Sequence, residues 1–287
     1  MANFILSSFA DEISSNFDEQ LIAVKKLEIP LIELRGVDGK SFAALSDDEV
    51  MTVKAKLEKA SIGLSALGSP IGKITLDDDF DTHLQLLDRI MDIGDMLNCK
   101  RIRMFSFYCG SPKSEAEFKK QVIIRIRTML DKVKTRGLTL YHENEKDIFG
   151  YSPERVLELA REFGGELRIV LDNGNFSFCG VNAAPAYGML RNYIDYMHIK
   201  DADEDGIIVP PGKGVACIKE VLQNINIDNP GKDIIITMEP HLMMFTGLEG
   251  LSKLDDIKHK YIFETPFEAF RVATEAVRDM IADLKIK

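Results

Sequence analysis

The chain has 287 residues, of which 45% are hydrophobic, and carries a formal net charge of −10 at pH 7. The apolar fraction is enough for a sizeable core, and the length accommodates one α/β barrel, which typically needs roughly 250 residues. The negative charge argues against sequence-independent binding to nucleic-acid phosphates, because such binding needs clustered positive charge. The composition suits a soluble protein with a small-molecule ligand.

The amino-terminal stretch, MANFILSSFADEI, contains neither a basic leader nor a long apolar run. We identify no segment with the roughly 20 apolar residues that a membrane-spanning helix requires. The cysteines, at positions 99, 109, 179 and 217, are scattered without a C-x-x-C pair. This spacing favours free thiols in a reducing compartment over a disulfide. We therefore expect a cytoplasmic protein without a membrane partner.

Apolar runs that end at turn residues recur along the whole chain and predict strands. The predicted strands are about Phe4–Phe9, Pro30–Leu34, Ile62–Leu67, Arg101–Phe107, Leu138–Glu145, Arg168–Leu171, Tyr193–Ile199 and Asp233–Met238. Amphipathic segments lie between them and predict helices. The predicted helices are about Phe17–Leu27, Ser46–Ala60, Phe80–Leu97, Ser114–Thr135, Ser152–Gly164, Ala184–Asn192 and Val215–Ile225, with a last helix from Thr265. Ser or Thr followed three residues later by Glu marks three of the starts as capping boxes.

Strands that alternate with helices are typical of parallel βα units. The Gly-rich turn of a dinucleotide-binding fold is missing after the first strand, which weakens the alternative of an open doubly wound sheet. We predict an α/β protein with one (β/α)8 TIM barrel domain over residues 1–287 and a C-terminal helical extension. More than twenty residues, Leu242–Glu264, separate the last strand from the last helix. Because common βα connections have 2–6 residues, we expect this segment to lie over or beside the active site.

Four successive predicted strands each end on a potential metal ligand: Glu143, Asp172, His198 and Glu239. An unpaired buried carboxylate is very unfavourable, so such groups belong at a surface, a metal or a catalytic cleft. Active sites of α/β barrels lie at the carboxyl ends of the strands, and side chains alternate along a strand. If these positions point inward, the four groups converge above the barrel core. Three carboxylates and one imidazole suit one divalent ion, Mn²⁺, Mg²⁺, Co²⁺ or Zn²⁺.

Five further residues are candidates for substrate binding. Glu33 and Arg35 share parity on the second strand and either face the site or pair with each other. His241 shares the parity of Glu239, and Lys213 lies in a Pro/Gly loop that can approach a ligand. Lys200 either contacts the substrate or forms a plain ion pair with Asp201. The four strand-end groups also have ordinary interpretations, as a surface carboxylate, a turn cap or a core histidine, but their recurrence favours a site.

Short motifs surround these positions: HEN at Glu143, LDNGN at Asp172, MHIKD at His198 and MEPH at Glu239, with FADE, IELRG and PPGKG elsewhere. In this order the chain resembles the sugar isomerase/epimerase superfamily with a xylose isomerase-like TIM barrel. The resemblance implies that the four strand-end residues bind one divalent metal. It also implies that Glu143 and Glu239 act as an acid/base pair on either side of the substrate. The expected activity is isomerisation or epimerisation of a small keto sugar, polyol or sugar phosphate by proton transfer through an enediolate.

The sequence departs from the family at one informative position. Ketose 3-epimerases of the family often carry a histidine three residues after the aspartate, where this chain has Asn175. Three alternatives therefore stay open: an inosose-type dehydratase, an endonuclease IV-like repair nuclease, and a barrel that binds metal and ligand without turnover. Endonuclease IV-like members use several histidines for a three-zinc cluster, and of the five in this chain only His198 and His241 fall clearly at site positions, which argues against the nuclease. A homo-oligomer is compatible with the sequence.

Overall fold

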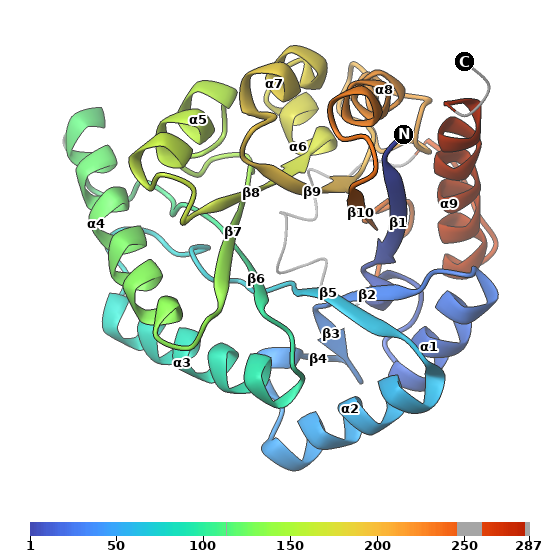
Figure 1. Ribbon diagram of the computed structural model, residues 1–287, viewed down its shortest axis with the longest axis horizontal. Helices are drawn as coiled ribbons and strands as arrows, with labels where there is room; N and C mark the ends of the chain where they lie inside the picture. Colours follow the sequence, from blue (N-terminus) through green and yellow to red (C-terminus); the bar gives the residue numbers. More distant parts are fainter. Residues whose placement is uncertain (113, 246–259, 285–287) are drawn as a thin grey trace.

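The computed structural model describes residues 1–112, 114–245 and 260–284. Parallel strands form a nearly closed barrel surrounded by helices (Figure 1). The barrel strands are β1 (Asn3–Ser8), β2 (Leu31–Leu34), β5 (Gly63–Leu67), β6 (Arg101–Met104), β7 (Thr139–Glu143), β8 (Arg168–Asp172), β9 (Ile194–Ile199) and β10 (Asp233–Met238). Ladders join them in the order β1-β10-β9-β8-β7-β6-β5-β2, and β1 packs against β2 at the remaining seam. The predicted barrel is confirmed.

The helices that cover the barrel are α1 (Phe17–Lys26), α2 (Asp47–Ala60), α3 (Phe80–Met96), α4 (Glu115–Lys134), α5 (Pro153–Glu162), α7 (Ala183–Leu190), α8 (Ile218–Asp228) and α9 (Pro266–Asp283). The predicted capping box at Ser46 is present: its hydroxyl accepts from the amide of Glu49, whose carboxylate accepts from the amide of Ser46. α9 follows the last barrel strand and buries Phe270 and Val277. In Figure 1 it lies outside β1, in the place of the barrel's final helix.

Several short elements were not predicted. They are η1 (Ala10–Glu12), β3 (Gly36–Val37), β4 (Lys40–Ser41), η2 (Phe42–Ala44) and α6 (Asn173–Phe178). β6 also ends at Met104 rather than Phe107. The cause is that the following amides bond to a loop: Phe105 donates to the carbonyl of Ile71 at 2.7 Å, and Phe107 to that of Gly72 at 2.9 Å.

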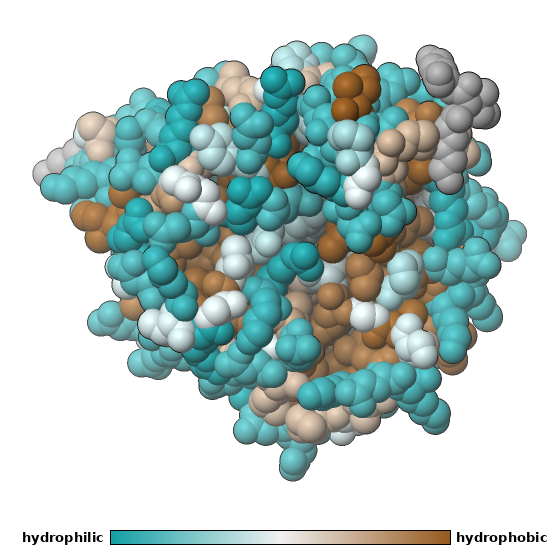
Figure 2. Space-filling model, viewed as in Figure 1, coloured by the Kyte–Doolittle hydropathy of each residue, from teal (hydrophilic) through white to brown (hydrophobic). Residues whose placement is uncertain are grey.

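Two hydrophobic regions position the site. The larger core lies between the strands and the helices. A smaller cluster inside the barrel consists of Ala66, Tyr141, Val170 and Tyr196, with Ile235 packed against it. Tyr141, Val170 and Tyr196 each lie two residues before one of Glu143, Asp172 and His198, so the cluster forms the floor beneath these strand-end residues. Hydrophilic residues cover most of the face in Figure 2, and apolar ones are visible between them around its middle.

Two further expectations can be compared with the structure. All four cysteines are free, which confirms the preference for thiols over a disulfide. In the part of the chain that the structure describes, no helix is both long and apolar enough to cross a membrane.

Candidate active site

The four predicted ligands converge at the carboxyl ends of their strands. Glu143 and Asp172 are the last residues of β7 and β8, His198 lies near the end of β9, and Glu239 follows β10. All four are buried, and each offers a ligand atom within 4.8 Å of the others. The alternation of side chains along the strands therefore places them together, as the parity argument requires.

The His198 imidazole lies at the centre of this group. Its Nδ1 is 3.0 Å from Oε1 of Glu143 and 3.6 Å from Oε2 of Glu239. Its Nε2 is 2.9 Å from Oε2 of Glu33, on the other side of the ring. Burial by itself lowers the pKa of His198, but the carboxylates of Glu33 and Glu143 outweigh it and raise that pKa well above the usual value.

Glu33 lies behind His198 and is fully buried. It accepts hydrogen bonds from the hydroxyl of Tyr196 at 3.2 Å and from that of Thr237 at 3.1 Å. The β2–β5 ladder shifts register between Ile32 and Glu33, and such irregularities re-aim side chains in barrels. Glu33 thus orients the imidazole, as a carboxylate behind a metal-ligating histidine commonly does.

The two oxygens of Asp172 have different surroundings. Oδ1 accepts from the amide of Asn175 at 2.8 Å and so caps α6. Oδ2 is buried and accepts no hydrogen bond from any described residue, although Nζ of Lys200 lies 3.2 Å away. Burial raises the pKa of Asp172 to about 7, against the opposing effect of Lys200. A buried oxygen without a hydrogen bond is unusual and fits the ligand of a cation.

Lys200 does not pair with Asp201. Its ammonium lies between Asp172 and Glu239, 3.4 Å from Oε2 of the latter. Burial lowers the pKa of Lys200, but these two carboxylates outweigh it and raise that pKa. Asp201 instead accepts from the amides of Gly212, Gly214 and Ala216 and holds the Pro/Gly loop in place.

Glu239 is also bound by a guanidinium. Nη1 of Arg35 donates to its Oε1 at 2.8 Å. Nε and Nη2 of Arg35 donate to Asp11 at 2.8 and 3.0 Å, and Nη2 also lies 3.4 Å from Oε1 of Glu12. Arg35 therefore faces the site and does not pair with Glu33. Burial opposes ionisation of Glu239, but Lys200, His241 and Arg35 hold its pKa well below the usual range.

His241 and Glu12 extend the site beyond Glu239. His241 has a left-handed backbone, with φ of 49°, and donates its amide to Glu12 at 2.8 Å. Its Nε2 lies 3.3 Å from Oε1 of Glu12 and 3.4 Å from Oε1 of Glu239. Burial raises the pKa of Glu12 to about 8 and lowers that of His241 to about 4. The FADE motif, which contains Glu12, was the available signal for this missed residue.

Arg103, on β6, was the second residue that the sequence analysis missed. Its Nη1 donates to Oε2 of Glu143 at 2.8 Å, and both side chains are buried. Burial opposes ionisation of Glu143, but His198 and Arg103 outweigh it and lower the pKa of that carboxyl. Asn175, in the position of the family histidine, donates to Glu143 at 3.4 Å and to the carbonyl of Asn144 at 3.0 Å.

Two predictions are not resolved by these contacts. Lys213 is exposed, and no contact among the described residues joins it to the four ligands. The expected cover over the site, Leu242–Glu264, lies largely outside the described residues. At its start, the ring of Phe245 lies 5.5 Å from that of His241 and 5.0 Å from the guanidinium carbon of Arg35.

The family model of the xylose isomerase-like TIM barrel matches residues 21–253, so the chain belongs to this family. A D-allulose 3-epimerase from Methylomonas sp. is similar in structure, with a TM-score of 0.75 and 14% identity over 98% of this chain and 100% of that chain. A probable 3-DHS dehydratase from Bacillus anthracis has a TM-score of 0.72 and 15% identity over 97% of this chain and 99% of that chain. A xylose isomerase-like TIM barrel protein from Mycobacterium smegmatis in complex with magnesium has a TM-score of 0.69 and 13% identity over 99% of this chain and 98% of that chain. No curated protein sequence matches this chain.

Proposed function

We propose that this protein is a divalent-metal-dependent sugar isomerase or epimerase that acts on a small keto sugar, polyol or sugar phosphate. The observation that carries the proposal is the convergence of Glu143 and Glu239 on Nδ1 of one buried histidine, His198. The two glutamates come from β7 and β10, between which β8 and β9 lie in the barrel. A substrate bound among them therefore has a carboxylate available from either side.

The four buried side chains fit a divalent ion. Glu143, Asp172, His198 and Glu239 would hold it, and the hydrogen-bond-free Oδ2 of Asp172 supports this assignment. When bound, such an ion polarises a carbonyl and its neighbouring hydroxyl. The magnesium complex of a structural neighbour agrees with a hard cation in this fold, and the oxygen-rich set favours Mg²⁺ or Mn²⁺ over softer metals.

The acid/base work falls to the two glutamates. His198 and Arg103 lower the pKa of Glu143, and Lys200, His241 and Arg35 lower that of Glu239, so both carboxyl groups are held ionised. An ionised carboxylate is the form that removes the proton alpha to a carbonyl, which leaves an enediolate of the substrate. Because both glutamates are ionised at rest, the second one first takes up a proton from solvent and then delivers it to the opposite face of the enediolate, while the first releases the substrate proton to solvent. Lys200 and His241 lie beside Glu239 and are the candidates for contact with substrate oxygens.

Isotope exchange tests this function. The metal-loaded protein would be incubated in D₂O with a panel of ketoses, ketose phosphates and inososes. We expect an epimer or isomer of one panel member, with deuterium at the carbon alpha to its carbonyl. Conversion without deuterium at that carbon would contradict the enediolate chemistry.

A dehydratase is the second candidate, and Asn175 favours it. Its amide is engaged by Glu143 and Asn144 and is 2% exposed, so it does not offer the substrate the imidazole found in ketose 3-epimerases. Loss of water from a β-hydroxy ketone begins with the same proton removal. The same incubations distinguish the two activities, because dehydration gives an ultraviolet-absorbing conjugated ketone and epimerisation does not.

A further inference from the structure

Each candidate acid/base glutamate is bound through one oxygen by its own arginine. Arg103 binds Oε2 of Glu143 and Arg35 binds Oε1 of Glu239, both at 2.8 Å. The other oxygen of each glutamate faces Nδ1 of His198. One oxygen is therefore held by an arginine, and the other is directed to the metal centre, where its protein donors, Asn175 for Glu143 and Lys200 for Glu239, are farther away at 3.4 Å.

We propose that Arg103 is a positioning residue for Glu143: it holds Oε2 so that Oε1 alone is presented to the metal centre. The inference rests on the proposed metal site, which it extends to a residue on β6. A carboxylate with both oxygens free can rotate or bind a cation through both. Arg103 prevents this because a guanidinium is planar and its N–H groups have fixed directions.

The surroundings of Arg103 keep its guanidinium in place. Its central carbon lies 4.6 Å from the ring centroid of Phe105 and 5.4 Å from that of Phe9, and 3% of the residue is exposed. A Cβ on Gly68 would lie 2.7 Å from Cε1 of Phe9 and 3.3 Å from Nη2 of Arg103. The guanidinium of Arg103, packed against the rings of Phe105 and Phe9, therefore has little room to move, and a positioning residue requires such a fixed place.

The two arginines differ in how many acids they bind. Arg35 binds Asp11 through two N–H groups in addition to Glu239. Arg103 has Glu143 as its one salt-bridge partner within the described residues, and its buried Nε has no hydrogen-bond partner there. Because no other acid holds it, the effect of Arg103 on the site passes through Glu143.

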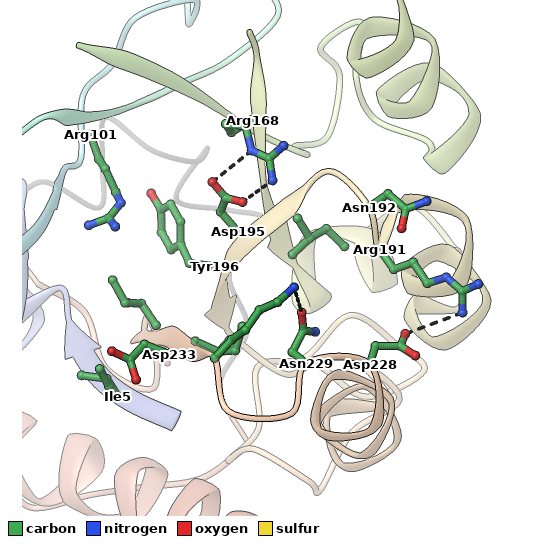
Figure 3. A pocket seen from close by; sticks show the side chains of 14 residues that line it. Ile5, Arg101, Arg168, Arg191, Asn192, Asp195, Tyr196, Asp228, Asn229 and Asp233 are labelled. Carbon is green, nitrogen blue, oxygen red and sulfur yellow. Dashed lines mark hydrogen bonds and ion pairs between the residues drawn. The ribbon is translucent and has the colours of Figure 1, made fainter. Parts of the chain in front are cut away.

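The same strand supplies a matched control. Arg101 precedes Arg103 with the same parity, but it lines a pocket of about 670 Å³ at the opposite mouth of the barrel. Figure 3 shows Arg101 and Tyr196 among the residues that line this pocket, and the guanidinium of Arg101 donates to the carbonyl of Ser65 at 3.3 Å. Removing Arg101 therefore removes an inward-facing arginine of β6 without changing the contacts of Glu143.

The test is Co²⁺ binding by the full chain, measured by calorimetry and by the visible absorption of the bound ion. Arg103→Met should weaken Co²⁺ binding by roughly 10- to 100-fold, the usual effect of removing a group that orients a metal ligand. It should also change the absorption spectrum, because the number of bound oxygens changes. Added guanidinium ion at millimolar concentration should restore part of the affinity. Arg101→Met should bind Co²⁺ as the unmodified protein does.

A double variant decides whether Arg103 acts through Glu143. If it does, Arg103→Met combined with Glu143→Gln binds Co²⁺ no more weakly than Glu143→Gln alone. Additive losses, or an Arg103→Met variant whose binding and spectrum match those of Arg101→Met, would overturn the proposal. Arg103→Lys, which keeps the charge and loses the planar group, replaces Arg103→Met if circular dichroism shows that the latter does not fold. Unchanged binding by Asp172→Asn would instead refute the metal site itself.

Discussion

At the scale of single residues, Asp172 shows how one side chain serves both fold and site. Its Oδ1 caps α6, while its Oδ2 lies in the centre without a hydrogen bond. An asparagine placed there keeps an oxygen for the cap. Its amide group would then face the ammonium of Lys200, which is 3.2 Å from Oδ2. The substitution therefore removes a charge from the centre and preserves the local helix.

Asp172→Asn should thus weaken metal binding far more than it weakens the fold. We expect Mn²⁺ affinity to fall by at least roughly 100-fold, while the far-ultraviolet circular dichroism stays unchanged. Titration calorimetry with Mn²⁺ measures the affinity. A variant that binds Mn²⁺ normally would show that Oδ2 is not a ligand.

The two glutamates should respond differently from Asp172. Replacing Glu143 or Glu239 by Gln should preserve part of the metal binding and lower turnover by roughly 100-fold or more, the usual scale for lost acid–base catalysis. The neutral amide can still offer an oxygen, but it cannot accept the substrate proton. Turnover would be measured at saturating metal on the substrate found in the isotope experiment. Full activity of both variants would refute the mechanism.

At the scale of elements, regular alternation made the barrel and the convergence of its strand-end residues predictable. Glu143, Asp172, His198 and Glu239 follow from parity on strands that are buried on both faces. The contacts of Glu33, Glu12 and Arg103 did not follow. Glu33 sits at a register shift in the β2–β5 ladder, and Glu12 lies in a short 3₁₀ turn, so neither obeys a simple period. Arg103 has the correct parity, but its partner Glu143 lies on the next strand, 40 residues further along the chain, and no local pattern pairs the two residues.

The turn at Gly72 depends on contacts with residues that are distant in the sequence, so no local sequence pattern predicts it. Gly72 has φ of +85°, and a Cβ there would lie 1.9 Å from the carbonyl oxygen of Phe105. The amide of Gly72 donates to Nε2 of His83 on α3 at 2.8 Å. His83 therefore holds a turn next to the barrel, and its imidazole must be neutral to accept this hydrogen bond.

This contact predicts a pH effect. Burial lowers the pKa of His83 to about 4, whereas an unfolded histidine titrates near 6.5. Between these values the unfolded chain binds a proton that the folded protein does not, so stability decreases as the pH falls. Gln in place of His83 accepts the same hydrogen bond without titrating. The drop in unfolding temperature from pH 7.5 to pH 5 should be smaller by a few degrees in His83→Gln than in the unmodified protein. An equal drop in the unfolding temperature of the two proteins would exclude this role of His83.

At the scale of the whole molecule, the barrel concentrates acidic groups at one mouth. The buried carboxylates there are Asp11, Glu12, Glu33, Glu143, Asp172 and Glu239, and the cations beside them are the buried Arg103 and Lys200 and the partly buried Arg35. Burial raises the pKa of Glu12 to about 8 and that of Asp172 to about 7, so protons neutralise part of this carboxylate charge. A divalent ion that takes the place of such protons binds only the folded arrangement of these groups, so its binding free energy adds to the stability of the entire domain.

Metal loading should consequently stabilise the protein as a whole. A ligand that binds only the folded state at 100 times its dissociation constant adds about 2.7 kcal/mol. For a chain of this size that corresponds to an increase in the unfolding temperature of roughly 5 °C. The measurement is thermal unfolding by circular dichroism in excess EDTA and in excess Mn²⁺. Arg101→Met, altered at the opposite mouth, should show the full shift, and Asp172→Asn should show little or none. An equal shift in Asp172→Asn would mean that Mn²⁺ stabilises the fold from some other place, and the absence of a shift in the unmodified protein would count against a resident ion.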